Sequence, residues 1–172
     1  MFIKRCTLAE IDALQSVCRK TFMETFEEQN TKEDMEKFLE EAYDQEILKK
    51  ELSDPDSMIY IAFNEENKAL GYLKLNVADA QTEKGYDNSL EIQRIYILKE
   101  AKGQGVGTEF MKIAENKAIE LGFSYIWLGV WEYNFAAQKF YQNKGFKRFS
   151  EHIFVLGDDK QTDYLMKKEI TH

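Results

Sequence analysis

Hydrophobic and polar positions in the first third of the chain predict one strand and two helical regions. Residues 2–6 form a short apolar strand pattern, and Thr7 is suited to cap the helix that follows. A second helical region begins after Thr31, with Asp34 three residues on, and ends at the only proline, Pro55. Near-helical spacing marks the inward positions of both regions, which are Ile11, Leu14, Val17 and Phe22 in the first and Leu39, Tyr43 and Ile47 in the second.

The remainder of the chain alternates strand and helix patterns. Apolar runs at residues 58–63 and 70–77 predict a hairpin, residues 78–88 a polar loop, and residues 90–97 and 125–131 two further strands. A helix is expected from the glycines near residue 105 to Leu121, and a shorter one from Asn134 to Gly145. Closing strands near residues 146–155 and 162–168 flank a turn at 157–160. This order predicts a single domain, residues 1–172, with a mixed central sheet and helices on both faces.

Glycines stand where the strand period of residues 90–97 changes to the helical one. Gly103, Gly105 and Gly107 allow close approach of the backbone, and the N-terminus of the following helix offers unpaired N–H groups and a partial positive charge. A phosphate group suits that position. A plain glycine turn is the alternative.

Two familiar nucleotide motifs do not fit this segment. A Walker A loop needs Gly-Lys-Ser/Thr, whereas Gly107 is followed by Thr108 without a lysine. The dinucleotide fingerprint needs its third glycine where Thr108 stands.

Composition excludes several classes of protein. No apolar run approaches the roughly 18 residues of a membrane span, and the first residues lack a secretory signal pattern. Cys6 and Cys18 fit neither a metal spacing nor a redox pair, and two histidines, His152 and His172, are too few for a histidine-rich metal site. We therefore expect a cytoplasmic protein with reduced thiols and no metal.

The formal charge of −8 argues against a nucleic-acid partner. Acidity is concentrated between Glu24 and Asp56, where thirteen acidic residues face four lysines, a net charge of −9. Such a segment is either a solvated helical face or a surface that attracts a polycation.

Two segments in the second half resemble motifs of the GNAT superfamily of N-acetyltransferases. Residues 97–107 resemble its motif A, and residues 134–146 resemble its later helix motif. Five further segments, at residues 21–26, 71–76, 90–97, 126–132 and 157–163, resemble the PaiA-type spermidine/spermine acetyltransferases, so the likeness spans the chain. Motif A usually begins with Arg or Gln, whereas Lys102 here keeps the charge but lacks the planar fork for two phosphate contacts.

The resemblance implies a GNAT fold, an α/β (α+β) arrangement with a twisted, mostly antiparallel sheet of about seven strands and about four helices. It implies acetyl transfer from acetyl-CoA to a primary amine of a polyamine by direct attack, without a metal, and leaves a homodimer open. The residues it assigns to acetyl-CoA are Ile95, Tyr96, Ile97, Lys102, Gly103, Gln104, Gly105, Val106, Gly107, Thr108, Asn134, Ala137, Tyr141 and Lys144. Backbone N–H groups of residues 95–97 would hold the acyl oxygen, and those of residues 103–108 the pyrophosphate.

The resemblance also implies catalytic roles. Tyr141 matches the tyrosine that donates a proton to the departing thiolate, although its spacing alone favours a buried aromatic. Glu91 is the leading candidate for a base acting through water, with a strand ion pair as its alternative reading. Glu132 and His152 are weaker candidates.

For the acceptor, the resemblance points to the acidic N-terminal helices. Glu24, Glu27 and Glu28 are expected cation contacts, while Trp131 and Tyr133 could add cation–π contacts. Trp131 could instead pack against the cofactor. Two other functions stay open: a GNAT enzyme that acts on a protein N-terminus, a lysine side chain or an aminoglycoside, and a CoA-binding regulatory module without turnover.

Overall fold

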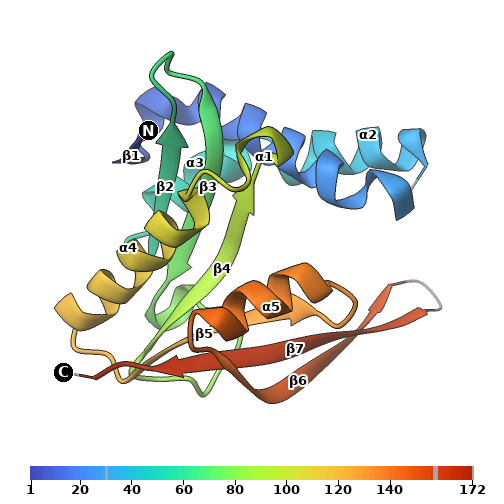
Figure 1. The fold of residues 1–172 in the computed structure, drawn as a ribbon. Helices are drawn as coiled ribbons and strands as arrows, with labels where there is room; N and C mark the ends of the chain where they lie inside the picture. Colours follow the sequence, from blue (N-terminus) through green and yellow to red (C-terminus); the bar gives the residue numbers. More distant parts are fainter. Residues whose placement is uncertain (30, 157–158, 172) are drawn as a thin grey trace.

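The computed structural model describes residues 1–29, 31–156 and 159–171 and contains one seven-stranded sheet (Figure 1). The strands lie in the order β1-β2-β3-β4-β5-β7-β6, and every neighbouring pair is antiparallel except β4 and β5. In chain order the elements are β1 (Phe2–Arg5), α1 (Ile11–Phe26), α2 (Lys32–Ala42), α3 (Gln45–Ser53), β2 (Ser57–Phe63), β3 (Ala69–Asn76), β4 (Ser89–Ile97), α4 (Val106–Glu120), β5 (Tyr125–Trp131), α5 (Phe135–Asn143), β6 (Lys147–Leu156) and β7 (Asp159–Glu169). Short 3-10 turns lie at Leu8–Glu10, Glu27–Gln29, Ala78–Ala80 and Lys99–Ala101.

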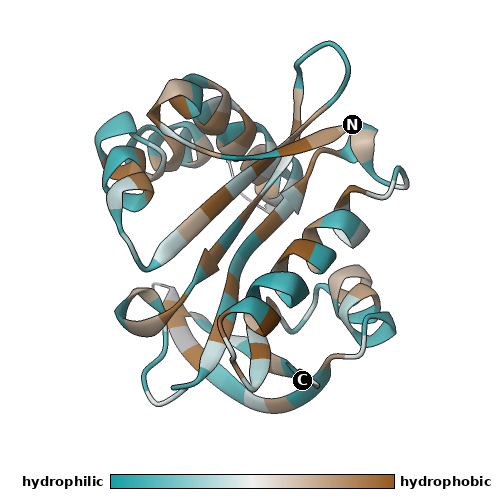
Figure 2. Cartoon of the chain, turned by 90° about the vertical axis from the view of Figure 1, so that its left-hand side faces the viewer, coloured by the Kyte–Doolittle hydropathy of each residue, from teal (hydrophilic) through white to brown (hydrophobic). Residues whose placement is uncertain are grey.

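Helices cover both faces of the sheet, as expected (Figure 2). Arg94 of β4 reaches Glu51 of α3, with 2.7 Å between Nη1 and Oε1, so α3 lies on the face to which Arg94 points. Ile97 of β4 points to the opposite face, towards α4. If Gly107 of α4 carried a Cβ atom, that atom would lie 3.2 Å from Cδ1 of Ile97. The sheet therefore separates α4 from the N-terminal helices, and each face can carry its own half of a site.

The second helical region is two helices rather than the one that its spacing predicts. Asp44 has extended backbone angles (φ −60°, ψ 142°), which end the helical path after α2 and begin α3. The break shifts the phase of the apolar positions, so Leu48 is buried whereas Ile47 is largely exposed. The prediction that Ile47 continues the inward face of Leu39 and Tyr43 is wrong for this reason, and the chain has five α-helices among its described residues.

A buried ion cluster ties α3 to β3 and β4. The Glu51 carboxylate lies 3.0 Å from Lys74 Nζ and 2.7 Å from Arg94 Nη1. Burial would raise the pKa of Glu51, but the two cations outweigh it and hold that pKa below its usual value. The cluster lies directly beside the residue at which β4 becomes irregular, so it fixes that strand in place.

The closing hairpin is longer than predicted, since β7 begins at Asp159 rather than near Thr162. Of the predicted turn at 157–160, Gly157 and Asp158 lie outside the described residues. The hairpin pairs β6 with β7 and joins β5 through β7.

Candidate active site

The two parallel strands at the centre of the sheet separate part-way along their length. Their register runs from Ser89 opposite Tyr125 to Ile92 opposite Leu128 and goes no further. Beyond that point β4 continues against β3 as far as Ile97, and β5 continues against β7 as far as Trp131. Gln93 is an extra residue, because Leu75 pairs with Ile92 and the adjacent Lys74 pairs with Arg94. An opening therefore forms between Gln93–Ile97 and Gly129–Trp131.

Two of the three backbone amides predicted to hold an acyl oxygen are directed into this opening. The Leu98 N–H donates to the Leu70 carbonyl of β3 at 2.9 Å. Because N–H directions alternate along a strand, the Tyr96 N–H also points to β3, whereas those of Ile95 and Ile97 point away from it. Ile95 and Ile97 thus offer a pair of donors at the separated strands.

Two of the three glycines in the turn before α4 have a left-handed backbone conformation. Gly103 (φ +84°) and Gly105 (φ +87°) are left-handed, and a Cβ on either would meet no atom within 4 Å. Gly105 is the residue before α4. The first N–H groups of that helix have no hydrogen-bond acceptor within the helix. The turn is thus an exposed cradle with the positive end of the helix behind it. At its start, the Lys102 N–H donates to the Lys99 carbonyl at 3.2 Å, and Gln104 Nε2 donates to the Glu100 carbonyl at 3.1 Å.

The second family-like segment meets the first at this turn. Lys144, which follows α5, donates from Nζ to the Thr108 hydroxyl at 3.0 Å. A Cβ on Gly107 would lie 3.1 Å from the Phe140 ring, so α4 and α5 are packed closely. Asn134 caps α5, because its Oδ1 accepts the Ala137 N–H at 3.2 Å. Segments that are 30 residues apart in the chain thereby form one face of the opening.

Tyr141 of α5 is buried, with 8% of its surface exposed, and packs against Phe140 and Phe146. Burial raises the pKa of its hydroxyl, and the neighbouring Tyr96 raises it further. The side chain is therefore a protonated donor at neutral pH.

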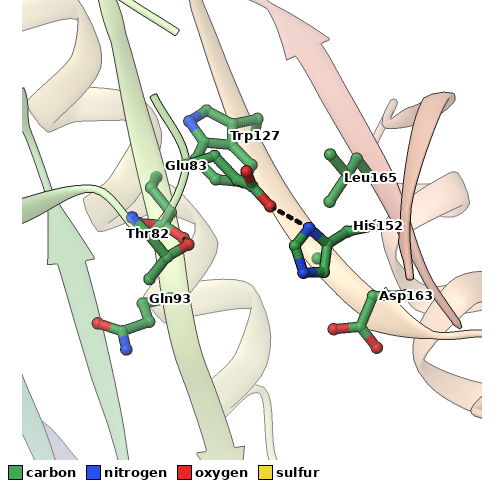
Figure 3. A pocket seen from close by; sticks show the side chains of 9 residues that line it. Thr82, Glu83, Gln93, Trp127, His152, Asp163 and Leu165 are labelled. Atoms are coloured by element: carbon green, nitrogen blue, oxygen red, sulfur yellow. Dashed lines mark hydrogen bonds and ion pairs between the residues drawn. The ribbon is translucent and has the colours of Figure 1, made fainter. Parts of the chain in front are cut away.

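The opposite face of the sheet carries an open pocket of about 380 Å³ at the point where the strands separate (Figure 3). Gln93 and Gly129, the first residues beyond the paired part of β4 and β5, both line it. Its other lining residues come from β4, β5, β6, β7 and the loop before β4, and are Thr82, Glu83, Glu91, Trp127, His152, Asp163 and Leu165. Three carboxylates thus share one small pocket.

Glu91 is nearly inaccessible, with 3% of its surface exposed. Its Oε1 accepts the Asn76 amide at 3.0 Å and the Thr82 N–H at 2.9 Å, and its Oε2 accepts the Thr82 hydroxyl. The predicted alternative, an ion pair with a lysine or arginine, is not what the structure shows, since these partners are an amide, a backbone N–H and a hydroxyl. Both oxygens of Glu91 are already hydrogen-bonded.

His152 and Asp163 face one another across β6 and β7, where they are register partners. His152 Nδ1 lies 2.7 Å from Glu83 Oε1, which joins β6 to the loop before β4 across the pocket (Figure 3). Burial raises the pKa of Asp163, and His152 partly offsets this.

The five residues predicted to bind the acceptor have other partners or exposed positions in the structure, and their role stays a prediction. Glu24 accepts the Lys99 N–H at 3.1 Å, and Glu27 and Glu28 lie on the short turn beyond α1. Trp131 Nε1 donates to Gln161 Oε1 at 2.9 Å, and Tyr133 is 58% exposed. None of these five lines the pocket.

Sequence reasoning gave no acceptor role to Glu83, Gly129 or Asp163. Only the likeness at residues 126–132 and 157–163 drew attention to the segments that hold Gly129 and Asp163.

Comparison with known proteins agrees with this geometry. A model of the acetyltransferase (GNAT) family matches residues 18–146. The chain belongs to the GNAT family. It is 46% identical over 155 residues to an uncharacterised N-acetyltransferase of Lactobacillus delbrueckii subsp. lactis. The matched residues make up 90% of this chain and 89% of that protein. Members of this family use acetyl-CoA as the acyl donor, and this GNAT chain is an acetyl-CoA-dependent N-acetyltransferase.

Solved GNAT structures share the fold over nearly the whole chain. The PaiA N-acetyltransferase of Thermoplasma acidophilum, solved in complex with coenzyme A, has a TM-score of 0.76 at 23% identity and covers 98% of this chain and 99% of that one. The ribosomal-protein-S18-alanine N-acetyltransferase of Escherichia coli has a TM-score of 0.71 at 12% identity, covering 99% and 94%. A nourseothricin acetyltransferase also shares the fold, with a TM-score of 0.59 at 24% identity over 69% of this chain and 68% of that one. Since the acceptors named for the last two proteins differ, the fold alone does not set the acceptor. In the described part of this GNAT chain, no helix combines the length and apolar character needed to cross a membrane.

Proposed function

We propose that this GNAT enzyme acetylates a primary amine of a polyamine such as spermidine or spermine. The observation that carries this proposal is the pocket lined by the carboxylates Glu83 and Asp163, with Glu91 buried in its wall, which opens where β4 and β5 separate. A chain of ammonium groups complements such a pocket, and exposed charge pairs of about 1 kcal/mol or less each add up only for a polycation. The resemblance of the five segments named above to the PaiA-type spermidine/spermine acetyltransferases implies the same class of acceptor.

The residues on the other face fit acetyl-CoA. The open cradle at Gly103 and Gly105 has room for a pyrophosphate against the N-terminus of α4, and the Lys144 side chain lies at its edge on Thr108. The expected ligands Lys102, Gln104 and Val106 belong to the same turn. The opening between the strands would take the pantetheine arm, while Asn134 and Ala137 hold the start of α5 beside it.

Acetyl-CoA supplies a thioester carbonyl, and the chain supplies hydrogen bonds to the atoms that become charged. The N–H groups of Ile95 and Ile97 are the donors for the acyl oxygen. Tyr141 stays protonated and donates to the sulfur as it departs. Because its raised pKa lies above the thiol value of about 8.5, donation of a hydrogen bond contributes more than full proton transfer.

The acceptor must lose a proton before it can attack. A primary amine with a pKa near 10.4 is neutral in about one molecule in 2,500 at pH 7, which corresponds to about 4.6 kcal/mol. A carboxylate near the attacking nitrogen serves as a relay that takes this proton and passes it to solvent. Glu91 is the base that the family likeness suggests, acting through water.

The test is a panel assay of thiol release from acetyl-CoA with four acceptors: spermidine, spermine, a lysine-containing peptide and an aminoglycoside. We expect turnover of the polyamines, with mass spectrometry showing one added acetyl group. Turnover of the peptide or the aminoglycoside but of neither polyamine contradicts the proposal. Tight CoA binding without turnover of any amine favours a regulatory module instead.

A further inference from the structure

We propose that Asp163, reached over Gly129, is the carboxylate that takes the proton from the attacking amine and that Gly129 sets which amines can reach it. This inference rests on the proposed amine acceptor and deepens it. It assigns the proton-accepting role to β7 rather than to Glu91 of β4.

Gly129 lies in the pocket wall at a position where other residues would block it. It is the first residue of β5 beyond the paired segment, and it faces the same side as Trp127, two residues earlier. A Cβ at this position would stand 3.5 Å from Leu165 Cδ2 and 3.8 Å from Asp163 Oδ2. A side chain there would take up pocket space directly beside the Asp163 carboxylate, and its absence leaves that space to an acceptor.

The backbone gives no other reason for a glycine at this position. Gly129 has no positive φ, and the three contacts of the added Cβ, with Leu165 and Asp163, are at ordinary van der Waals distances. The glycine therefore matters for the space it leaves. An unbranched primary amine fits such a passage better than a branched one.

Asp163 is a better proton acceptor than Glu91 on grounds of geometry. Glu91 is 3% exposed and accepts three hydrogen bonds. The Asp163 carboxylate is half-buried on the open pocket, and no hydrogen-bond donor to it is found among the described residues. The titratable groups around it are His152 of β6, Tyr96 and Glu91 of β4, and Glu83 of the preceding loop. Burial raises the pKa of Asp163, in the direction that strengthens a base.

The proposed step balances as follows. The acceptor ammonium gives one proton to the Asp163 carboxylate, from which it passes to solvent. The freed lone pair on nitrogen forms the new N–C bond, and the C–S bond breaks with its electron pair on sulfur. The nitrogen loses its second proton once the N–C bond has formed, and the departing thiolate, which is stabilised by a hydrogen bond from Tyr141, takes up one proton, so the products are the amide, the CoA thiol and one proton in solution.

The experiment compares D163N, G129V and E91Q with the wild type, and uses E169Q as a matched control. Glu169 is exposed at the far end of β7, beside Lys167, so its change removes a charge from the same strand away from the pocket. We expect D163N to lower kcat/KM for spermidine about 100-fold and to remove the acidic limb of its pH profile. We expect G129V to raise the KM for spermidine at least 10-fold, and to weaken spermidine binding in calorimetry, with acetyl-CoA affinity unchanged.

Three outcomes separate the claims. If the wild type acetylates spermidine while D163N keeps kcat/KM within twofold and keeps the acidic limb, the inference is overturned and the proposed function stands. If only E91Q loses the acidic limb of the pH profile, Glu91 is the proton acceptor and the inference about Asp163 is overturned. If the wild type turns over no amine, the proposed function fails first and the inference with it. Thermal melts show whether each variant is folded.

Discussion

The two faces of the strand opening present different chemical groups. On the α4 side, the groups are backbone amides, glycine conformations and helix ends, from residues 95–108 and 134–146. On the opposite side they are side chains drawn from four strands and a loop. The first face is suited to a donor that a whole family shares, and the second to an acceptor that differs among its members. Changes on one face should therefore affect one substrate.

The largest effect is expected for Tyr141→Phe. Removal of the hydroxyl takes away the donor to the departing sulfur, and we expect kcat to fall about 100-fold. The KM for acetyl-CoA should change less than threefold, because the ring and its packing against Phe140 and Phe146 remain. Steady-state kinetics with both substrates varied measure the two effects. An unchanged kcat removes Tyr141 from the mechanism.

A smaller effect on the same face is expected for Gly105→Ala. Gly105 has a φ of +87°, and an alanine there costs about 1 kcal/mol in the left-handed conformation and distorts the cradle. We expect the KM for acetyl-CoA to rise about 10-fold with little change in the KM for the amine.

Gly122→Ala is the matched control for this change. Gly122 has a φ of +75° and equally open space, and it lies just beyond α4 at its opposite end. Both variants should lose about 1 kcal/mol in the free energy of unfolding. Only Gly105→Ala should weaken acetyl-CoA, and equal kinetic effects of the two would show that the cradle has no special role.

On the acceptor face, a moderate effect is expected for Glu83→Gln. Loss of this carboxylate should raise the KM for spermidine up to about fivefold, since an exposed charge contact is worth about 1 kcal/mol or less. Glu27→Gln, on the turn beyond α1, should change it less than twofold. The comparison also tests the acidic N-terminal segment. If Glu27→Gln raises the KM for spermidine more than Glu83→Gln does, the acceptor binds at the acidic N-terminal segment instead.

The smallest effect is one of stability. Burial raises the pKa of Asp163 above its ordinary value of 3.8, so the folded protein holds that proton to higher pH than the unfolded chain does. Stability from this group is present below pH 3.8 and is lost as the pH rises through the raised value. Asp163→Asn should therefore raise the melting temperature slightly at pH 7 and leave it unchanged below pH 3.8. A lower melting temperature at pH 7 contradicts this assignment.

The contrast between backbone groups on one face and side chains on the other also explains which features could be predicted from the sequence. Glycine positions, the Asn134 cap and the strand-to-helix change are local features, so they predicted the strands, the mixed sheet and the cradle at Gly103 and Gly105. The break at Asp44 was missed because the spacing of Leu39, Tyr43 and Ile47 is also that of one continuous helix.

The pocket that we propose for the acceptor could not be predicted in the same way. Its members are far apart in the chain, and Glu83 and His152 meet only because β6 lies beyond β7 at one edge of the sheet while the loop before β4 reaches across. Charge density instead directed attention to Glu24, whose carboxylate is used by the Lys99 N–H. A count of acidic residues reports where charge is, and not which of it faces a cavity.

The most direct test of the two-sided account is steady-state kinetics of Gly105→Ala and Gly129→Val, with acetyl-CoA and spermidine each varied against a saturating level of the other. The account predicts that the first variant raises the KM for acetyl-CoA alone and the second raises the KM for spermidine alone. If both variants shift the same substrate, the division of the site between the two faces of the sheet is contradicted.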